Sequence, residues 1–102
     1  MSYEKHGRGM IAVNLVHNYL IREGYQVFSE DQSQGMIDMV AINEDGDMML
    51  IDVKALARRA DGTKINRMLR PNQKKLEQVM NTKVQLIYAD VDSGEIDFNR
   101  RK

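Results

Sequence analysis

The spacing of hydrophobic residues along the chain predicts two helices and five strands. Between Ala12 and Leu20 the apolar residues recur three and four positions apart, which is typical of one face of an amphipathic helix. We expect this helix to span about residues 9–23, since Gly24 supplies a common helix stop. Pro71 suits the first turn of a second helix that continues through residues 73–80. Short apolar runs predict strands at residues 25–29, 36–42, 48–53, 84–89 and 95–98.

The order of these elements predicts an α/β domain with a central mixed sheet flanked by helices. It reads helix, three strands, a basic connector whose structure stays open, helix and two strands. The NEDGD turn, with its Asp-Gly pair, makes the second and third strands antiparallel neighbours. The 102 residues suit a single domain, with a core at 9–90 and a frayed basic tail at 99–102.

The composition of the chain limits both the cellular compartment that we expect and the kinds of site that it can form. No apolar run approaches the roughly 18 to 20 residues that cross a bilayer, and the opening residues lack the apolar stretch of a secretory signal. Cysteine is absent, which excludes disulfides and thiolate metal sites. We therefore expect a cytoplasmic protein, encoded by a cell or by a phage.

Charge is divided unevenly along the chain although its formal sum is zero. Residues 1–53 hold three basic and nine acidic residues, a balance of −6, so residues 54–102 carry +6. Within 54–75 only Asp61 opposes the basic residues. Seven of these are candidates to bind nucleic-acid phosphates: Arg58, Arg59, Lys64, Arg67, Arg70, Lys74 and Lys75. A solvated charged face is the alternative interpretation.

Two acids interrupt otherwise apolar strands, and they are the main candidates for chemistry. A buried carboxylate is costly without a partner, so Asp38 and Asp52 need a cation, hydrogen bonds or water beside them. The turn between their strands centres near residue 45, about which 38 and 52 are symmetric, so we expect directly opposed positions. Two carboxylates this close repel, and a divalent cation removes the repulsion. Oxygen ligands of this kind suit Mg²⁺ or Mn²⁺.

Lys54 follows Asp52 by two residues and projects from the same face of its strand. A pair of carboxylates with a lysine beside it is typical of phosphoryl-transfer sites, where a metal polarises the phosphate and the ammonium assists the attacking water. An Asp–Lys salt bridge at a strand edge is the structural alternative.

At these residues the sequence resembles the PD-(D/E)XK nuclease superfamily, and most of all the archaeal Holliday-junction resolvases. In GMIDMV, Asp38 matches the first acid, and in MLIDVK, Asp52, Val53 and Lys54 match the (D/E)-x-K half. LIREGYQV is similar to the first helix and strand of these families, and LRPNQKKL to a later helix whose glutamine, here Gln73, approaches the metal-bound water. The likeness covers about residues 8–90 and implies a restriction-endonuclease-like fold.

The chain departs from the resolvase pattern at one position. Those proteins carry a metal-binding glutamate on the first helix, where this chain has Val13. The resemblance then implies a one-metal site made by Asp38, Asp52 and the Val53 carbonyl.

The resulting hypothesis is a Mg²⁺-dependent endonuclease for DNA, with branched or double-stranded DNA as substrate and a homodimer as the working form. Asp38, Asp52, Lys54 and Gln73 are its predicted catalytic residues. A catalytically silent nuclease fold that binds nucleic acid or a partner protein is the second hypothesis, which the missing helix acid favours. A small structural module with salt-bridged acids is the third.

Overall fold

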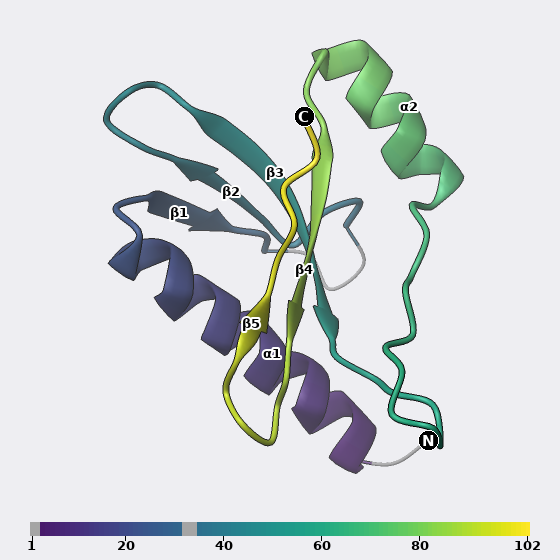
Figure 1. The fold of residues 1–102 in the computed structure, drawn as a ribbon. Coiled ribbons are helices and arrows are strands. Elements are labelled where there is room, and N and C mark those ends of the chain that lie inside the picture. Colours follow the sequence, from purple (N-terminus) through teal and green to yellow (C-terminus); the bar gives the residue numbers. More distant parts are fainter. Residues whose placement is uncertain (1–2, 32–34) are drawn as a thin grey trace.

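A five-stranded mixed sheet and two helices make up residues 3–31 and 35–102, the part of the chain that the computed structural model describes (Figure 1). The elements are α1 (Tyr3–Arg22), β1 (Gln26–Ser29), β2 (Met39–Ile42), β3 (Met48–Ala55), α2 (Pro71–Met80), β4 (Val84–Ala89) and β5 (Ile96–Asp97). The predicted α/β class with a central mixed sheet is confirmed. Neither of the helices described here is long and apolar enough to cross a membrane.

The five strands lie in the sheet in the same order as in the sequence. β1, β2 and β3 form two antiparallel pairs, β3 and β4 are parallel, and β4 and β5 are antiparallel. A parallel pair needs a long crossover connection, which the connector and α2 supply between β3 and β4. β3 therefore lies at the centre of the sheet, with neighbours of both orientations.

α1 covers one face of the sheet and forms the hydrophobic core with it (Figure 1). Its fully buried residues are Ala12, Val16 and Leu20, spaced four apart as the sequence predicted. The helix begins at Tyr3 rather than near residue 9, because the apolar spacing that predicted it starts only at Ala12. It ends before Gly24, whose φ of 90° is accessible to glycine but strained for other residues.

The alternation of side chains along β3 separates the core from the polar residues of the sheet. Met49, Ile51 and Val53 belong to the core cluster beside α1. Asp52 lies between two of these residues and projects from the opposite face, because successive strand residues point to opposite sides. That opposite face is where α2 contacts the sheet, through a hydrogen bond from Gln73 to Asp52.

The connector between β3 and α2 has little regular structure, but several hydrogen bonds fix it. An isolated bridge joins Arg58 to Lys64, and the Asp61 carboxylate accepts the backbone N–H of Thr63 at 3.0 Å. Further along, the hydroxyl of Tyr88 on β4 accepts the backbone N–H of Arg67 at 2.7 Å. The basic segment is thus held against the sheet by contacts within it and with β4.

Arg100 and Arg101, in the segment for which the sequence predicted fraying, form several hydrogen bonds. The backbone N–H and C=O of Arg101 both bond the side chain of Gln85, at 2.7 and 2.8 Å. Its guanidinium pairs with Glu77 on α2, and Arg100 forms two hydrogen bonds to Asp47. Polar side chains far away in the sequence therefore anchor this segment, which shows no hydrophobic periodicity of its own.

Candidate functional site

The ladder between β2 and β3 has the predicted register but stops one residue before Asp38. The pairs from Met39–Ile51 to Ile42–Met48 all sum to 90, as the position of the turn implied. Asp38 departs from this ladder, because its backbone N–H donates to Ile51 O at 2.8 Å. The expectation of a directly opposed backbone pair at 38 and 52 is therefore wrong by one residue.

Beyond the end of the backbone ladder, the carboxylate of Asp38 accepts a hydrogen bond from β3. Its Oδ2 accepts the N–H of Val53 at 2.6 Å, so a side chain bonds the strand in place of a main-chain carbonyl. This bond holds the Asp38 carboxylate against β3, next to Asp52. Besides burial, the neighbouring Asp52 raises the pKa of Asp38, so the two carboxyl groups lie close together. The predicted juxtaposition of the acids is thus achieved by a different local geometry.

Asp52 is buried, with 5% of its surface exposed, and two side chains contact one of its oxygens. Gln73 Nε2 donates to Oδ2 at 2.7 Å, and the ammonium of Lys54 lies 3.2 Å from the same atom. A buried carboxylate is costly without such partners. The salt bridge between Asp52 and Lys54, which the sequence offered as an alternative to a functional role, is therefore present in this structure.

Burial, with a smaller contribution from the neighbouring Asp52 and Glu30, raises the pKa of Asp38 from 3.8 to about 6 against the opposing hydrogen bond from Val53. The acids outnumber the bases here: Asp38 and Asp52 contribute two negative charges and Lys54 one positive charge. The side chains that the site brings together thus leave a carboxylate only partly compensated. Such an arrangement favours a bound cation or proton.

Gln73 uses its whole amide group to connect three segments of the chain. This residue in the first turn of α2 is fully buried, and its Nε2 donates to both Asp52 and Met36 O, the second at 2.8 Å. Its Oε1 accepts the backbone N–H of Arg70 at 2.9 Å. The sequence predicted Gln73 near the site, and it lies there. Both of its N–H bonds, however, already have protein acceptors.

Sequence reasoning missed the relation between Gly35 and Glu30. A Cβ on Gly35 would lie 2.0 Å from Glu30 Oε2 and 3.3 Å from Ile37 O, so only glycine leaves room for that carboxylate. The backbone N–H of Glu30 also donates to Asp38 O at 3.0 Å. The glycine that opens the G-x-x-D motif therefore brings a third acid near Asp38, a contact that no spacing in the sequence indicates.

A metal ion here would depend on few protein ligands. Among residues 7–31 and 35–102, no three His, Asp or Glu side chains gather closely enough to form a metal site. Val13, where the resemblance to resolvases would place an acid, packs against the hydrophobic core. Asp38 and Asp52 could each supply an oxygen. The Val53 carbonyl is a third donor, since it points to the same edge of β3 as the N–H bonded to Asp38.

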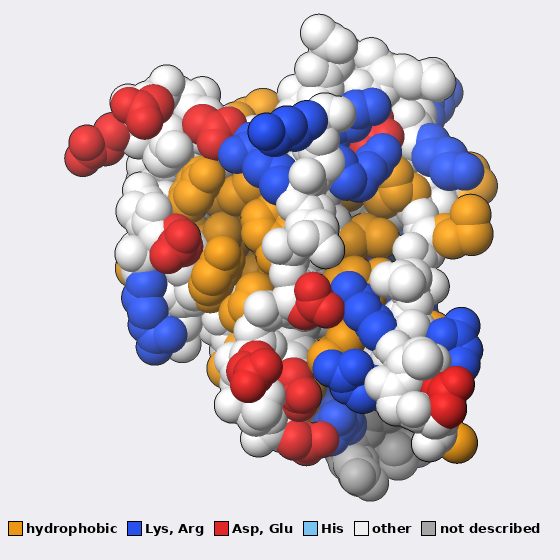
Figure 2. All heavy atoms as spheres, viewed as in Figure 1, with side chains coloured by type: hydrophobic (Ala, Val, Ile, Leu, Met, Phe, Trp, Pro, Cys, Tyr) orange, Lys and Arg blue, Asp and Glu red, His pale blue; other side chains and the backbone are white. Residues whose placement is uncertain are grey.

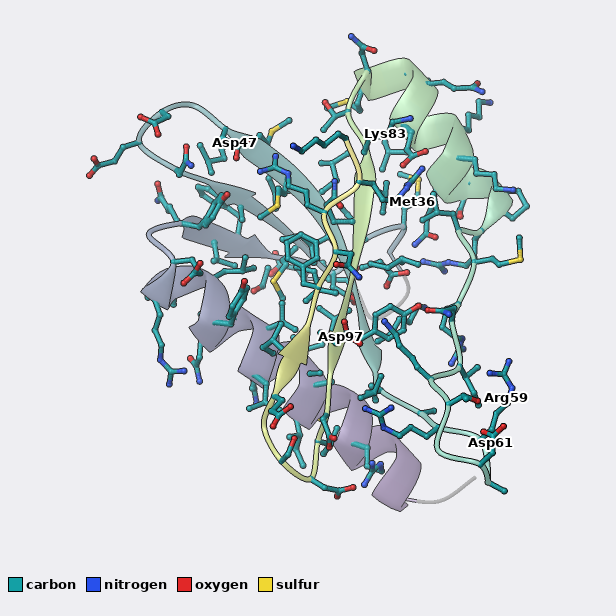
Figure 3. The ribbon with its side chains drawn as sticks, viewed as in Figure 1. Met36, Asp47, Arg59, Asp61, Lys83 and Asp97 are labelled. Atoms are coloured by element: carbon teal, nitrogen blue, oxygen red, sulfur yellow. The ribbon has the colours of Figure 1, made fainter. Side chains whose placement is uncertain are left out.

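The predicted phosphate-binding residues differ in how freely they face solvent. Lys64 pairs with Asp97 at 3.0 Å and lies 3.7 Å from the ring centre of Tyr88, so its charge is largely compensated. Arg70 is exposed, yet its guanidinium donates to Met36 O at 3.0 Å beside the site (Met36 is labelled in Figure 3). The other members of the set are exposed: Arg58, Arg59, Arg67, Lys74 and Lys75.

Comparison with known proteins identifies a shared fold but no family. No protein-family model matches the chain, and no curated protein sequence matches it either. Among solved structures, it is similar to the bacterial homing endonuclease I-Ssp6803I, with a TM-score of 0.54 and 15% sequence identity. The match covers 93% of this chain and 75% of that one. At this identity the likeness shows the fold alone.

Proposed function

We propose that this chain is a metal-dependent endonuclease that hydrolyses phosphodiester bonds in DNA, with Asp38, Asp52 and Lys54 in its active site. The observation that carries the proposal is the convergence of these residues with Gln73 beside the centre of the sheet. The fold shared with a homing endonuclease supports it, because that protein's fold provides a scaffold on which DNA cleavage occurs.

The donor set fits Mg²⁺ or Mn²⁺ rather than a softer metal. Asp38 and Asp52 offer carboxylate oxygens, the Val53 carbonyl offers a third, and hard divalent cations prefer such ligands. The excess of carboxylate charge over the single ammonium of Lys54 supports a cation between the two acids. When bound, the ion would polarise the phosphate and lower the pKa of a water molecule.

The residues of the chain would orient the reaction. Asp52 is held by Gln73, so its free oxygen has a fixed direction before substrate arrives. Lys54 projects from the same face of β3, where its ammonium can orient the attacking water and offset negative charge on the phosphate oxygens. Hydrolysis forms one phosphorus–oxygen bond and breaks another. The water loses a proton, and the departing sugar oxygen gains one.

We propose branched or double-stranded DNA as the substrate and a homodimer as the active form. The exposed arginines and lysines of residues 58–75 would bind the DNA backbone next to the site. One copy presents a single site and a small surface, so cutting both strands of a duplex or a junction calls for two copies.

The test is cleavage of a panel of linear, nicked, flapped and four-way DNA with Mn²⁺ present. We expect the parent to cut at least one substrate, and Asp52→Asn and Lys54→Met to lose cleavage by a factor of 100 or more (order of magnitude) while remaining folded. Asp97→Asn is the matched control, because it breaks another Asp–Lys pair, with Lys64 at 3.0 Å. Cleavage by Asp52→Asn and Lys54→Met at the parental rate would refute the proposed active site.

A catalytically silent nuclease fold that binds nucleic acid or a partner protein is the second candidate. It is favoured by Val13 packing against the core, at the position where resolvase-like nucleases carry an acid, and by the pairing of Asp52 with Lys54. Titration of Mn²⁺ into the metal-free protein separates the two candidates. A silent fold shows DNA binding with no metal binding at Asp38 and Asp52, whereas the nuclease binds both.

A further inference from the structure

A basic groove runs along α2, from residues beside its first turn to the end of the helix farther from Asp52. It has a volume of about 630 Å³ and runs between α2, the residues just before and just after this helix, and the C-terminal residues. Four of the nine residues that line it are basic, namely Lys74, Lys83, Arg101 and Lys102, and one is acidic, Glu77. A second hollow of about 290 Å³ adjoins it and shares Lys83, Arg101 and Lys102. Lys and Arg side chains gather in this part of the surface, near the C-terminal end (Figures 1 and 2).

Of the basic residues in this groove, Arg101 pairs with an acidic side chain, whereas the lysines are exposed. Arg101 is committed to Glu77 at 2.5 Å and to Val84 O at 3.0 Å, so it builds the wall and its charge is compensated. Lys83 lies at the start of β4 beside α2 (Figure 3), and it is exposed, as are Lys74 and Lys102. Among the described residues, none of these three lysines forms an ion pair. The groove therefore presents the positive charges of three exposed lysines beside an arginine that is held in place by hydrogen bonds.

We infer that this groove is a second binding surface for the DNA backbone, with Lys83 and Lys102 as contacts to phosphates away from the cut. The inference rests on the proposed function for the position of the DNA. It adds residues that lie outside the basic segment 58–75 and belong to a different part of the fold.

The geometry of α2 connects this surface with the proposed active site. Gln73, in the first turn, bonds Asp52, and the next residue, Lys74, already lines the groove. From Gln73 to Asn81, at the far end of the groove, the helix advances about 12 Å at roughly 1.5 Å per residue. Successive nucleotides of a DNA strand are about 3.4 Å apart along the axis, so this span corresponds to about three or four nucleotides. A backbone that reaches Asp52 can continue over Lys83.

Binding measurements without cleavage test the groove separately from the nuclease activity. We would measure the affinity for a duplex in Ca²⁺ or EDTA over a range of salt concentrations, for the parent and for Lys83→Gln/Lys102→Gln. Two lost phosphate contacts should lower affinity about tenfold at moderate salt and reduce the slope of log affinity against log salt by roughly 2. Lys83→Arg keeps the charge and should bind like the parent.

Arg22→Gln is the matched control, because it removes one exposed charge from the end of α1, next to β1 at the opposite edge of the sheet. It should leave affinity and slope unchanged. Parental affinity and slope in the double variant would overturn the inference, and the lysines would then serve only to offset the carbonyls at the C-terminal end of α2. A parent that binds DNA through these lysines but cuts no substrate would contradict the proposed function while supporting the groove.

Discussion

Gln73 donates a buried 2.7 Å hydrogen bond to Asp52 Oδ2, the same oxygen that the ammonium of Lys54 approaches to 3.2 Å. The first turn of α2 is thereby joined to the middle of β3. Because Gln73 also bonds Met36 O, one side chain sets the relative positions of α2, the segment before β2 and the central carboxylate. We therefore expect Gln73 to be a positioning residue that acts through Asp52.

Replacing Gln73 with Leu should impair metal binding more than folding alone explains. The change removes both hydrogen bonds of Nε2 and frees the Asp52 carboxylate to rotate. Loss of a side chain that orients a metal ligand costs about 10- to 100-fold in metal affinity or activity. Isothermal titration with Mn²⁺ and the cleavage rate measure this effect.

Gln85→Leu is the matched control for Gln73→Leu, because Gln85 is also buried and also bonds backbone, at Arg101. We expect it to lower stability and to leave Mn²⁺ affinity near the parental value. Equal Mn²⁺ affinities in the parent and in Gln73→Leu would exclude the positioning role.

Asp38→Asn should stabilise the metal-free protein at neutral pH. The Asp38 pKa is about 6 in the folded chain and 3.8 in a solvated carboxyl, so between these values the folded state binds more protons than the unfolded state. The free energy of unfolding of the parent therefore falls as pH rises from about 4 to 6 and is level above this window. At about 1.4 kcal/mol per pKa unit, discounted for partial exposure, the variant should gain roughly 1–2 kcal/mol at pH 7.5 and nothing near pH 4.

Urea unfolding of Asp38→Asn and parent across pH 4–8, with EDTA present, checks this trend. Asp47→Asn is a control of opposite sign, because the hydrogen bonds from Arg100 hold the Asp47 pKa below its usual value. The Asp47 variant should be less stable than the parent at neutral pH and lose that difference as the solution becomes acidic. A parent-like pH profile for Asp38→Asn would show that Asp38 titrates normally.

Gly35→Ala should lower the pKa of Asp38 without unfolding the protein. Its new Cβ would lie 2.0 Å from Glu30 Oε2, the mobile end of a side chain, which can move aside. The stability cost should be about 1 kcal/mol or less, as for changes that a flexible neighbour absorbs. NMR titration of Asp38 in Gly35→Ala and in Glu30→Gln should give shifts in the same direction, and an unchanged titration in both would remove Glu30 from the site.

Tyr88→Phe should loosen the connector by removing the acceptor of the Arg67 backbone N–H. The ring stays, so Lys64 keeps its contact 3.7 Å from the ring centre. We expect a loss of about 1 kcal/mol, the usual net value of a hydrogen bond, and faster hydrogen exchange at Arg67. Exchange at Gly62, in the turn of the bridge, should be unaffected. Unchanged exchange at Arg67 would mean that Tyr88 does not hold the connector.

The parts of the fold that depend on residues close together in the sequence could be predicted from the sequence. The four-residue spacing of Ala12, Val16 and Leu20 fixed the buried face of α1, and the Asp-Gly turn fixed the register of β2 and β3. The sequence also indicated which residues would meet, since Asp38, Asp52, Lys54 and Gln73 do gather. Whether they act in catalysis stays a prediction.

What the sequence did not reveal depends on polar contacts between distant segments. The carboxylate of Asp38 replaces a main-chain acceptor for the N–H of Val53. The alternation of apolar residues along the strands does not indicate this change in the pairing. The anchoring of Arg101 by Gln85 and Glu77 likewise joins positions 16 and 24 residues apart. Hydrophobic periodicity reports burial, whereas such hydrogen-bond partners are set only by the complete fold.

Paramagnetic broadening by Mn²⁺ in the amide NMR spectrum tests the central claim most directly. The account predicts that low Mn²⁺ concentrations first broaden the signals of Asp38, Asp52 and Val53, and that Asp38→Asn or Asp52→Asn abolishes this selective effect. The acidic β2–β3 turn at residues 43–47 serves as an internal comparison. Broadening confined to that turn, or spread evenly over the surface acids, would contradict a metal site between the two aspartates.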